Sequence, residues 1–321
     1  MKNGISARQV GVVLFTGLLS PAAVVAGMDW RGGWLAVPVV LAAAWCWRRW
    51  KGRMGKFPTL IYIVWMVMFA GAILAEAAGR ITAPENRGVE WVVVILWLPA
   101  LWLAKIKPDA FGRVAEIFYL AMGTVLVFVL VFGATQIKFG RLLGSSSEIW
   151  DSFITAVGIG CCGVAAVILR DGDRECERRK WLGWSGASAA ALALMSMVTV
   201  GVLSSPLVSE LDRPFFLMTV GLGQTARVEG LISVIWLLAD LTLVGVLLQS
   251  GCRLWSNMRL GCKRGMPWVL SAVVAGAALW FVRKNGGGIW IKEALPLCGV
   301  ILGGVIPVMG CLCAKCRKTK K

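Results

Sequence analysis

The chain has 321 residues, of which 58% are hydrophobic and 16% are charged, and its formal net charge is +17 at pH 7. Soluble domains contain roughly 45–50% apolar and about 25% charged residues, so this composition excludes an ordinary soluble protein. The chain contains no histidine, which excludes a Ser-His-Asp triad and every His-ligated metal site. We therefore expect an all-α polytopic membrane protein, and we predict neither enzymatic activity nor a cofactor.

Apolar runs alternate with short polar connections along the whole chain. A membrane-spanning helix needs about 20 predominantly apolar residues. Ten candidate spans can be distinguished, at 10–27, 32–47, 58–79, 90–104, 114–135, 152–169, 184–203, 228–250, 267–282 and 294–313. They leave too few residues for a soluble domain of normal size. Residues 1–321 are therefore predicted to form a single integral membrane domain.

Basic residues are concentrated in alternate connections, as the positive-inside rule expects of cytosolic loops. The basic side carries Lys2, Arg8, the groups at 48–56, 105–113, 170–180 and 253–264, and the tail at 314–321. The opposite side carries Arg31, Arg80, Arg87, Lys138, Arg141, Arg213, Arg227, Arg283, Lys284 and Lys292. This bias places both termini in the cytosol and explains the net charge without a nucleic-acid partner. The tail at 314–321 is also expected to bind anionic membrane lipid.

The first span has a second interpretation. Lys2 and Arg8, the run from Val10 to Leu19 and the small residues Ala22 to Gly27 also resemble a secretory signal peptide. Its removal would leave nine spans.

Two spans contain residues that favour a broken helix. Gly17, Leu18, Leu19, Ser20 and Pro21 lie in the middle of the first span. Serine is a good N-cap and proline suits the first position of a helix, so a second half-helix is expected to begin at Ser20-Pro21.

The sixth span contains Gly158, Ile159, Gly160, Cys161, Cys162 and Gly163, and the glycines permit an unwound turn there. In each span the alternative is that glycine only allows close helix packing.

The two breaks occupy matching positions in two halves of opposite orientation. Repeat one covers about 8–135 and repeat two about 152–313. Interrupted helices at corresponding positions of inverted halves indicate a transporter-type site at the membrane midplane. We therefore predict a 5+5 inverted-repeat fold of the LeuT type, with discontinuous helices 1 and 6 and half-helix N-termini facing an anionic group. The candidate ligand-binding residues are Gly17, Leu18, Leu19, Ser20, Pro21, Gly158, Ile159, Gly160, Cys161 and Trp236.

Three motifs resemble the endospore germination permease family, the B subunits of spore germinant receptors in the amino acid–polyamine–organocation superfamily. ISARQ at 5–9 resembles the Ile-Ser-x-x-Gln entry to span 1. GRVAEIFYL at 112–120 resembles the Arg-x-x-Glu segment that opens span 5. GLGQTARVEGLISVIWLL at 221–238 resembles an Arg-x-Glu segment before an aromatic-anchored helix, with Arg227, Glu229 and Trp236 in the matching places.

The resemblance implies a ten-helix inverted repeat, a small nutrient ligand that we expect to be an amino acid, and other germinant receptor subunits as partners. It also implies the cell membrane or the spore inner membrane as the location. This chain is shorter than is usual in the family, and its loops are trimmed.

Charged residues inside spans are costly and are functional by default. Asp240 lies near the centre of the eighth span, where it is expected either to couple to protons or to serve as a structural carboxylate. Glu76 and Glu116 lie nearer span ends and are expected to reach water or a basic partner such as Arg80 or Arg113.

The segment before span 8 is a second candidate. Residues 214–224 are expected to form a short outer helix or re-entrant segment, with Arg227 and Glu229 as part of an outer cap over the site. The alternative is a loop whose charges face solvent.

A cysteine cluster lies near the end of the chain. Cys311, Cys313 and Cys316 could supply three thiolates to zinc, but without a clear fourth ligand no metal site is predicted.

The leading functional hypothesis is a germinant receptor subunit that recognises a nutrient at the midplane and signals to partner subunits. The alternatives are an amino-acid transporter that works by alternating access, and a structural membrane partner with a vestigial cavity.

Overall fold

The computed structural model describes residues 5–26, 29–50, 56–82, 88–142, 149–162, 168, 176–211, 213–222, 226–258, 265–284 and 287–309. Within these ranges all regular structure is helical. The α-helices are α1 (Ala7–Val25), α2 (Trp30–Trp50), α3 (Lys56–Thr82), α4 (Val89–Lys105), α5 (Pro108–Thr135), α6 (Phe139–Leu142), α7 (Ile149–Cys162), α9 (Cys176–Leu203), α10 (Ser205–Glu210), α11 (Pro214–Leu222), α12 (Ala226–Asn257), α13 (Met266–Arg283) and α14 (Gly287–Cys298). The π-helix η3 (Gly299–Val305) continues α14. Each of the ten predicted runs coincides with a helix as far as it is described.

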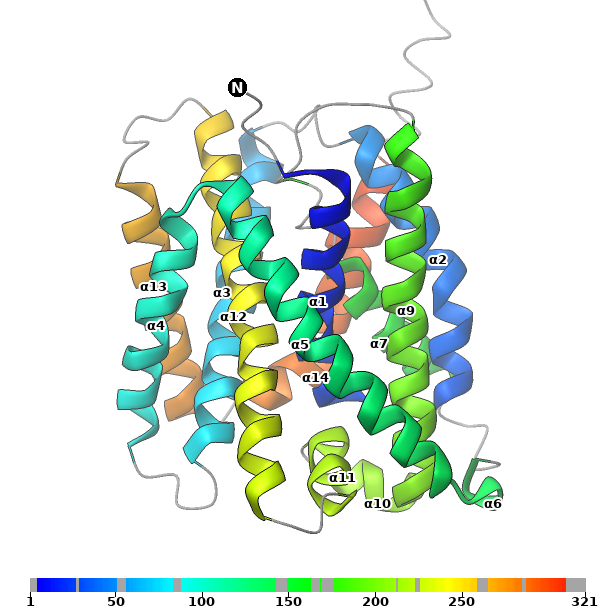
Figure 1. The fold of residues 1–321 in the computed structure, drawn as a ribbon. Helices are drawn as coiled ribbons and strands as arrows, with labels where there is room; N and C mark the ends of the chain where they lie inside the picture. Colours follow the sequence, from blue (N-terminus) through cyan, green and yellow to red (C-terminus); the bar gives the residue numbers. More distant parts are fainter. Residues whose placement is uncertain are drawn as a thin grey trace, which may run out of the picture.

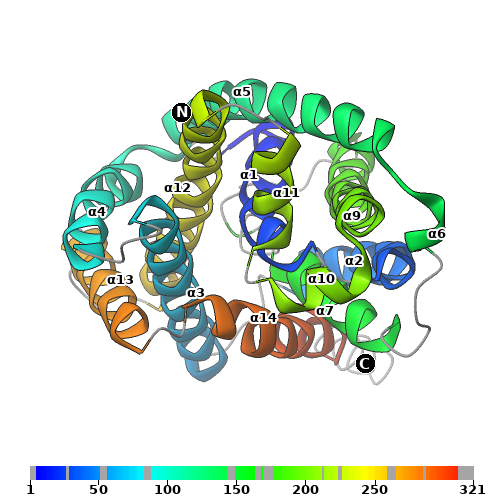
Figure 2. The same cartoon turned by 90° about the horizontal axis from the view of Figure 1, so that it is seen from below.

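The long helices form one bundle in which the connections alternate between its two ends (Figure 1). Seen along the bundle, one group consists of α3, α4, α12 and α13, and a second group consists of α2, α7 and α9. Helix α1 lies between the two groups (Figure 2). The helices α5 and α14 run along opposite edges (Figure 2). The short helices α10 and α11 lie at the end opposite the N-terminus, which we call the cap end (Figure 1).

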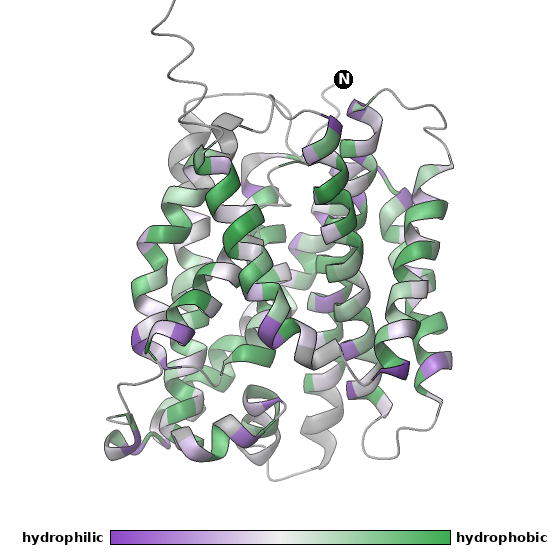
Figure 3. Ribbon diagram, turned by 180° about the vertical axis from the view of Figure 1, so that it is seen from behind, coloured by the Kyte–Doolittle hydropathy of each residue, from purple (hydrophilic) through white to green (hydrophobic). Residues whose placement is uncertain are grey.

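Among the described residues, seven helices are long and apolar enough to cross a membrane: those at Arg8–Val25, Lys56–Thr82, Pro108–Thr135, Gly186–Leu203, Ile232–Asn257, Met266–Arg283 and Trp290–Met309. Hydrophobic residues cover the outer helices through the middle of the bundle (Figure 3). Of these seven helices, α5 is the least buried, and it exposes Leu120, Phe128 and Phe132, as expected of a helix that faces lipid. The prediction of an all-helical polytopic membrane protein is confirmed.

The local sequence explains where the helices begin. Ser6 and Gln9 form a capping box at the start of α1, in which the Ser6 hydroxyl accepts from the Gln9 N–H at 3.2 Å and Gln9 Oε1 accepts from the Ser6 N–H at 3.1 Å. The ISARQ motif is therefore a helix-start signal. Proline occupies the first turn of α5, α10 and α13, where its missing N–H has no cost.

Glycines allow an unusually close approach of α7 to α14 and η3. A Cβ added to Gly158 would collide with the backbone of Pro296, and a Cβ added to Gly303 would lie 2.7 Å from the Cβ of Cys161. The Tyr62 hydroxyl of α3 donates to the Leu302 carbonyl in the π-helical turn. Backbone contact between helices is typical of membrane proteins, in which small residues replace the hydrophobic driving force. This edge of the bundle is therefore fixed by packing.

Candidate functional site

A buried ion pair joins α3 to α12. Arg80 Nη2 donates to Asp240 Oδ2, and each of the two side chains is 4% exposed. The Ser20 side chain of α1 also interacts with the Asp240 carboxylate, so three helices meet at this carboxylate. Desolvating two charges costs several kcal/mol per ion, on the order of what their pairing returns. The pair therefore adds little net stability, but neither member can be removed alone without a large loss.

Small buried residues precede Arg80 on α3 and Asp240 on α12. Ala75, Ala77 and Ala78 of α3 and Ala239 of α12 are all buried, so protein encloses both helices next to the ion pair. Glu76 lies one turn before Arg80, on the same face of α3. The sequence AEAAGR thus presents one negative and one positive group from a single helix face.

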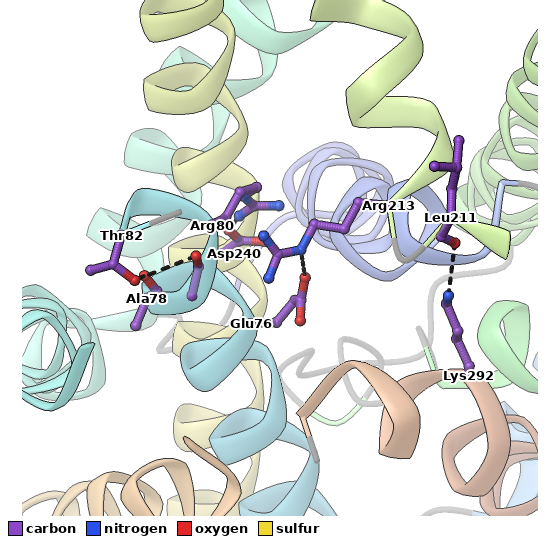
Figure 4. A network of polar contacts seen from close by, with 9 residues as sticks. Glu76, Ala78, Arg80, Thr82, Leu211, Arg213, Asp240 and Lys292 are labelled. Atoms are coloured by element: carbon purple, nitrogen blue, oxygen red, sulfur yellow. Dashed lines mark hydrogen bonds and ion pairs between the residues drawn. The ribbon is translucent and has the colours of Figure 1, made fainter. Parts of the chain in front are cut away.

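A second ion pair attaches the segment before α11 to α3. The Arg213 Nε donates to Glu76 Oε1, with the Arg213 side chain 24% exposed and Glu76 9% exposed (Figure 4). The Lys292 ammonium of α14 donates to the Leu211 carbonyl at 3.1 Å (Figure 4). Two cationic side chains therefore hold the chain at Leu211 and at Arg213, between α10 and α11.

Aromatic contacts of α11 cover the buried pair. The ring of Phe216 lies 6.0 Å from Arg80 Cζ, at the outer limit of a cation–π contact. The neighbouring Phe215 packs on Trp236 of α12 with ring centroids 5.2 Å apart. We call α10 and α11 with residues 211 and 213 the cap. It encloses the Arg80–Asp240 pair from the cap end of the bundle.

The first-span candidates are only partly brought together with this pair. Ser20 contacts Asp240, whereas a Cβ added to Gly17 would meet Leu243 of α12 at 3.4 Å, an ordinary packing distance. Leu18 and Leu19 are buried hydrophobic residues of the core.

The predicted break in the first span is wrong. α1 is continuous from Ala7 to Val25 with Pro21 inside it. Proline removes only the hydrogen bond to the Gly17 carbonyl, a loss that a packed membrane helix tolerates. Ser20 does not cap a second helix, because it lies inside the continuous α1, where its side chain interacts with Asp240.

The predicted turn in the sixth span is also wrong at Gly158–Gly160. Both glycines are helical in α7, which is described as far as Cys162, and Gly163 lies outside the described residues. Gly158 packs against α14, and a Cβ at Gly160 would collide with Val40 of α2. Ile159 and Cys161 are buried in the core. These residues fit the packing alternative.

Trp236 is the candidate of the eighth span that does reach the site. It lies one turn before Asp240 on the same face of α12, and it is buried. Among the described residues no acceptor lies within hydrogen-bond distance of its Nε1. The backbones of Arg227 and Glu229 belong to the first turn of α12, but their side chains lie outside the described part of the structure.

The cysteine cluster falls outside the structure's description. Cys311, Cys313 and Cys316 lie beyond Met309, as does the tail at 314–321. In the described ranges, no three His, Cys, Asp or Glu side chains lie close enough to hold a metal ion.

Sequence reasoning missed Arg80 and Arg213, which it assigned to loops. The Glu76 partner is Arg213, and the Glu116 partner is Arg8, with Arg8 Nε 3.7 Å from Glu116 Oε1. The expectation of a basic partner is therefore confirmed for both carboxylates, although the partners are not Arg80 and Arg113. The small residues before Arg80 were the available signal, because a run of alanine and glycine leading up to an arginine indicates a helix packed against protein.

Comparison with known proteins gives no relative from which to transfer a function: no protein-family model and no curated protein matches the chain.

Proposed function

We propose that the chain folds as two five-helix repeats of opposite orientation with ten membrane crossings. The pattern of helix contacts supports this. In this fold, α1 to α5 correspond in order to α7, α9, α12, α13 and α14 with η3. Under this correspondence, the contact between α2 and α7 in one half should be matched by a contact between α9 and α1. The contact between α3 and α13 should be matched by one between α12 and α4. Likewise α1–α5 corresponds to α7–η3, and α3–α14 to α12–α5. All of these pairs are in contact.

The largest contact without a comparable counterpart lies at the candidate site. α1 packs closely on α12, whereas α7 makes no comparable contact with α3 in the residues that the structure describes. This is where Ser20 meets Asp240. The two halves therefore differ at the candidate site, as expected if the site has been specialised on one half.

Within this fold, the function that we propose is recognition of a small nutrient, expected to be an amino acid, by a membrane subunit of a spore germinant receptor. The observation that carries the recognition role is the Arg80–Asp240 pair enclosed by the cap. Buried ionisable groups in membrane spans are rare and mark ligand or ion pathways.

The receptor assignment depends on the motif resemblance, and two of the three motifs contact each other. Gln9 of the first motif packs on Gly112 of the second, where an added Cβ would lie 2.9 Å from the Gln9 amide carbon. Arg8 pairs with Glu116 in the same two motifs. These residues of the first two motifs thus form one junction between α1 and α5, whereas Trp236 of the third motif packs on Phe215 of the cap.

In this proposal, ligand binding favours one arrangement of the cap and bundle, and partner subunits respond to that change. Both termini lie in the cytosol, and the location is the cell membrane or the spore inner membrane. Transport by alternating access is the second candidate, favoured by the correspondence between the helices of the two halves.

Binding and uptake assays separate these functions. The purified full-length chain is tested for saturable binding of the twenty standard amino acids in detergent, and for their uptake into proteoliposomes. Binding without uptake, together with co-purification of partner subunits from spores, supports the receptor. Uptake by the chain alone supports the transporter. Neither binding nor uptake would overturn both and leave the structural-partner alternative.

A further inference from the structure

We infer that Arg80 and Asp240 bind the carboxylate and the ammonium group of a zwitterionic amino acid, each exchanging its present partner for one group of the ligand. This rests on the proposed function and adds the residues and the charge requirement of the site. The structure presents these two groups paired with each other, and a zwitterion carries the same two charges on one small molecule.

The first argument is electrostatic. Both side chains are 4% exposed, so separating them in the bundle leaves two desolvated charges. A ligand with only a carboxylate compensates Arg80 and leaves Asp240 unpaired, and an amine does the reverse. Only a ligand with both charges compensates both groups at once. The pair is therefore expected to select zwitterions over acids and amines of the same size.

The second argument concerns the surroundings of the pair. Trp236 carries an indole N–H that, among the described residues, has no hydrogen-bond acceptor, and it lies one turn from Asp240. A ligand carboxylate between Arg80 and Trp236 would accept from both. The Ser20 side chain also interacts with Asp240 and would remain beside that carboxylate when an ammonium group binds.

The cap covers the side from which a ligand would reach the Arg80–Asp240 pair. The cap is attached near Arg213 by ion pairing with Glu76 and by Lys292 at the Leu211 carbonyl. Phe216, on the cap, is the residue whose ring faces Arg80. Release of the chain at Leu211 and Arg213 would therefore move Phe216 away and uncover the guanidinium.

The test uses thermal unfolding of the full-length chain in detergent. Each amino acid that raises the melting temperature is compared with its decarboxylated amine and its deaminated acid, for example alanine with ethylamine and propionate. The amine and the acid are expected to bind at least about 100-fold more weakly, since each leaves one buried charge unpaired. This comparison needs no variant.

A charge-free double variant supplies the second readout. Arg80→Met with Asp240→Leu replaces the pair by apolar side chains, which buried ion pairs commonly tolerate, and it is expected to unfold near the wild-type temperature without binding any amino acid. The matched control is Arg283→Met with Glu90→Leu, which removes an exposed pair with 3.0 Å between Arg283 Nε and Glu90 Oε1. This control is expected to bind as the wild type does.

The outcomes separate the inference from the function on which it rests. If amino acids bind the wild type, but their amines or acids bind equally well, or the double variant still binds, this inference fails and nutrient recognition stands. If no amino acid binds the wild type, both fail.

Discussion

Arg80 and Asp240 form an ion pair inside the bundle although 160 positions separate them in the sequence. Arg80 lies near the end of α3, and Asp240 lies in the middle of α12. Neither residue could be placed beside the other from local pattern, because the contact depends on how α3 packs on α12.

The first prediction concerns the charge balance of the pair. Asp240→Asn removes the negative charge and leaves the Arg80 guanidinium buried without a counter-charge. Breaking one side of a buried ion pair costs about 3–5 kcal/mol, so the variant is expected to unfold at a markedly lower temperature in detergent. Arg80→Met added to Asp240→Leu should recover most of this loss. If Asp240→Asn unfolds like the wild type, the pair is not desolvated as described.

The second prediction concerns the attachment of the cap. Glu76→Gln weakens the Arg213 contact, and hydrogen bonds to charged groups contribute about 1.5–3 kcal/mol. Backbone amides of α10 and α11 are therefore expected to exchange with deuterium at least about tenfold faster, while those of α3 and α12 stay protected. The matched control is Glu90→Gln, whose partner Arg283 is 72% exposed, and this change should not alter exchange in the cap. Unchanged exchange in both variants would contradict the role of Glu76.

The third prediction concerns Gly158. A leucine there would collide with the Pro296 backbone, so Gly158→Leu is expected to prevent folding instead of weakening ligand binding alone. Size-exclusion chromatography should show loss of the monodisperse peak. Gly276→Leu is the matched control, because an added Cβ in the middle of α13 meets nothing within 4 Å. Gly245 is unsuitable as a control, since its Cβ would lie 2.8 Å from the Phe111 ring. A well-folded Gly158→Leu variant would contradict the close approach of α7 to α14.

The fourth prediction concerns the π-helical turn. Tyr62→Phe removes the hydroxyl that donates to the Leu302 carbonyl and leaves that carbonyl without this donor. A lost hydrogen bond of this kind costs about 1–3 kcal/mol when the remaining group stays buried. We expect a lower melting temperature with unchanged helix content by circular dichroism. If the melting temperature does not change, this hydrogen bond does not stabilise η3 against α3.

The positions of the helices could be predicted from the sequence, because their lengths follow from the thickness of the membrane and their limits from proline, serine and charged residues. The expected short helix after span 7 is present as α11. Asp240 was identified as a candidate from its position alone.

Two kinds of feature could not be predicted. Ser20-Pro21 looks like a helix start, but the Ser20 hydroxyl has a partner on a distant helix, and packing holds α1 together through Pro21. Arg80 and Arg213 look like outer-loop cations, but they pair with carboxylates of the bundle. In both cases long-range contacts decide what the local residues do.

The last prediction concerns the orientation of the bundle. The N-terminus and the start of α9 lie at one end of the bundle, and the cap and α6 lie at the other (Figure 1). Cys176 begins α9, and Phe139 begins α6 and is exposed. In a variant that keeps Cys176 as its only cysteine, an impermeant maleimide should label intact cells only after the membrane is opened, because the basic connections favour the cytosolic side. In a cysteine-free background, Phe139→Cys should be labelled in intact cells. Labelling of Cys176 from outside would reverse the orientation and place the cap in the cytosol. Labelling of both positions from the same side would contradict the membrane-spanning arrangement of the helices between them.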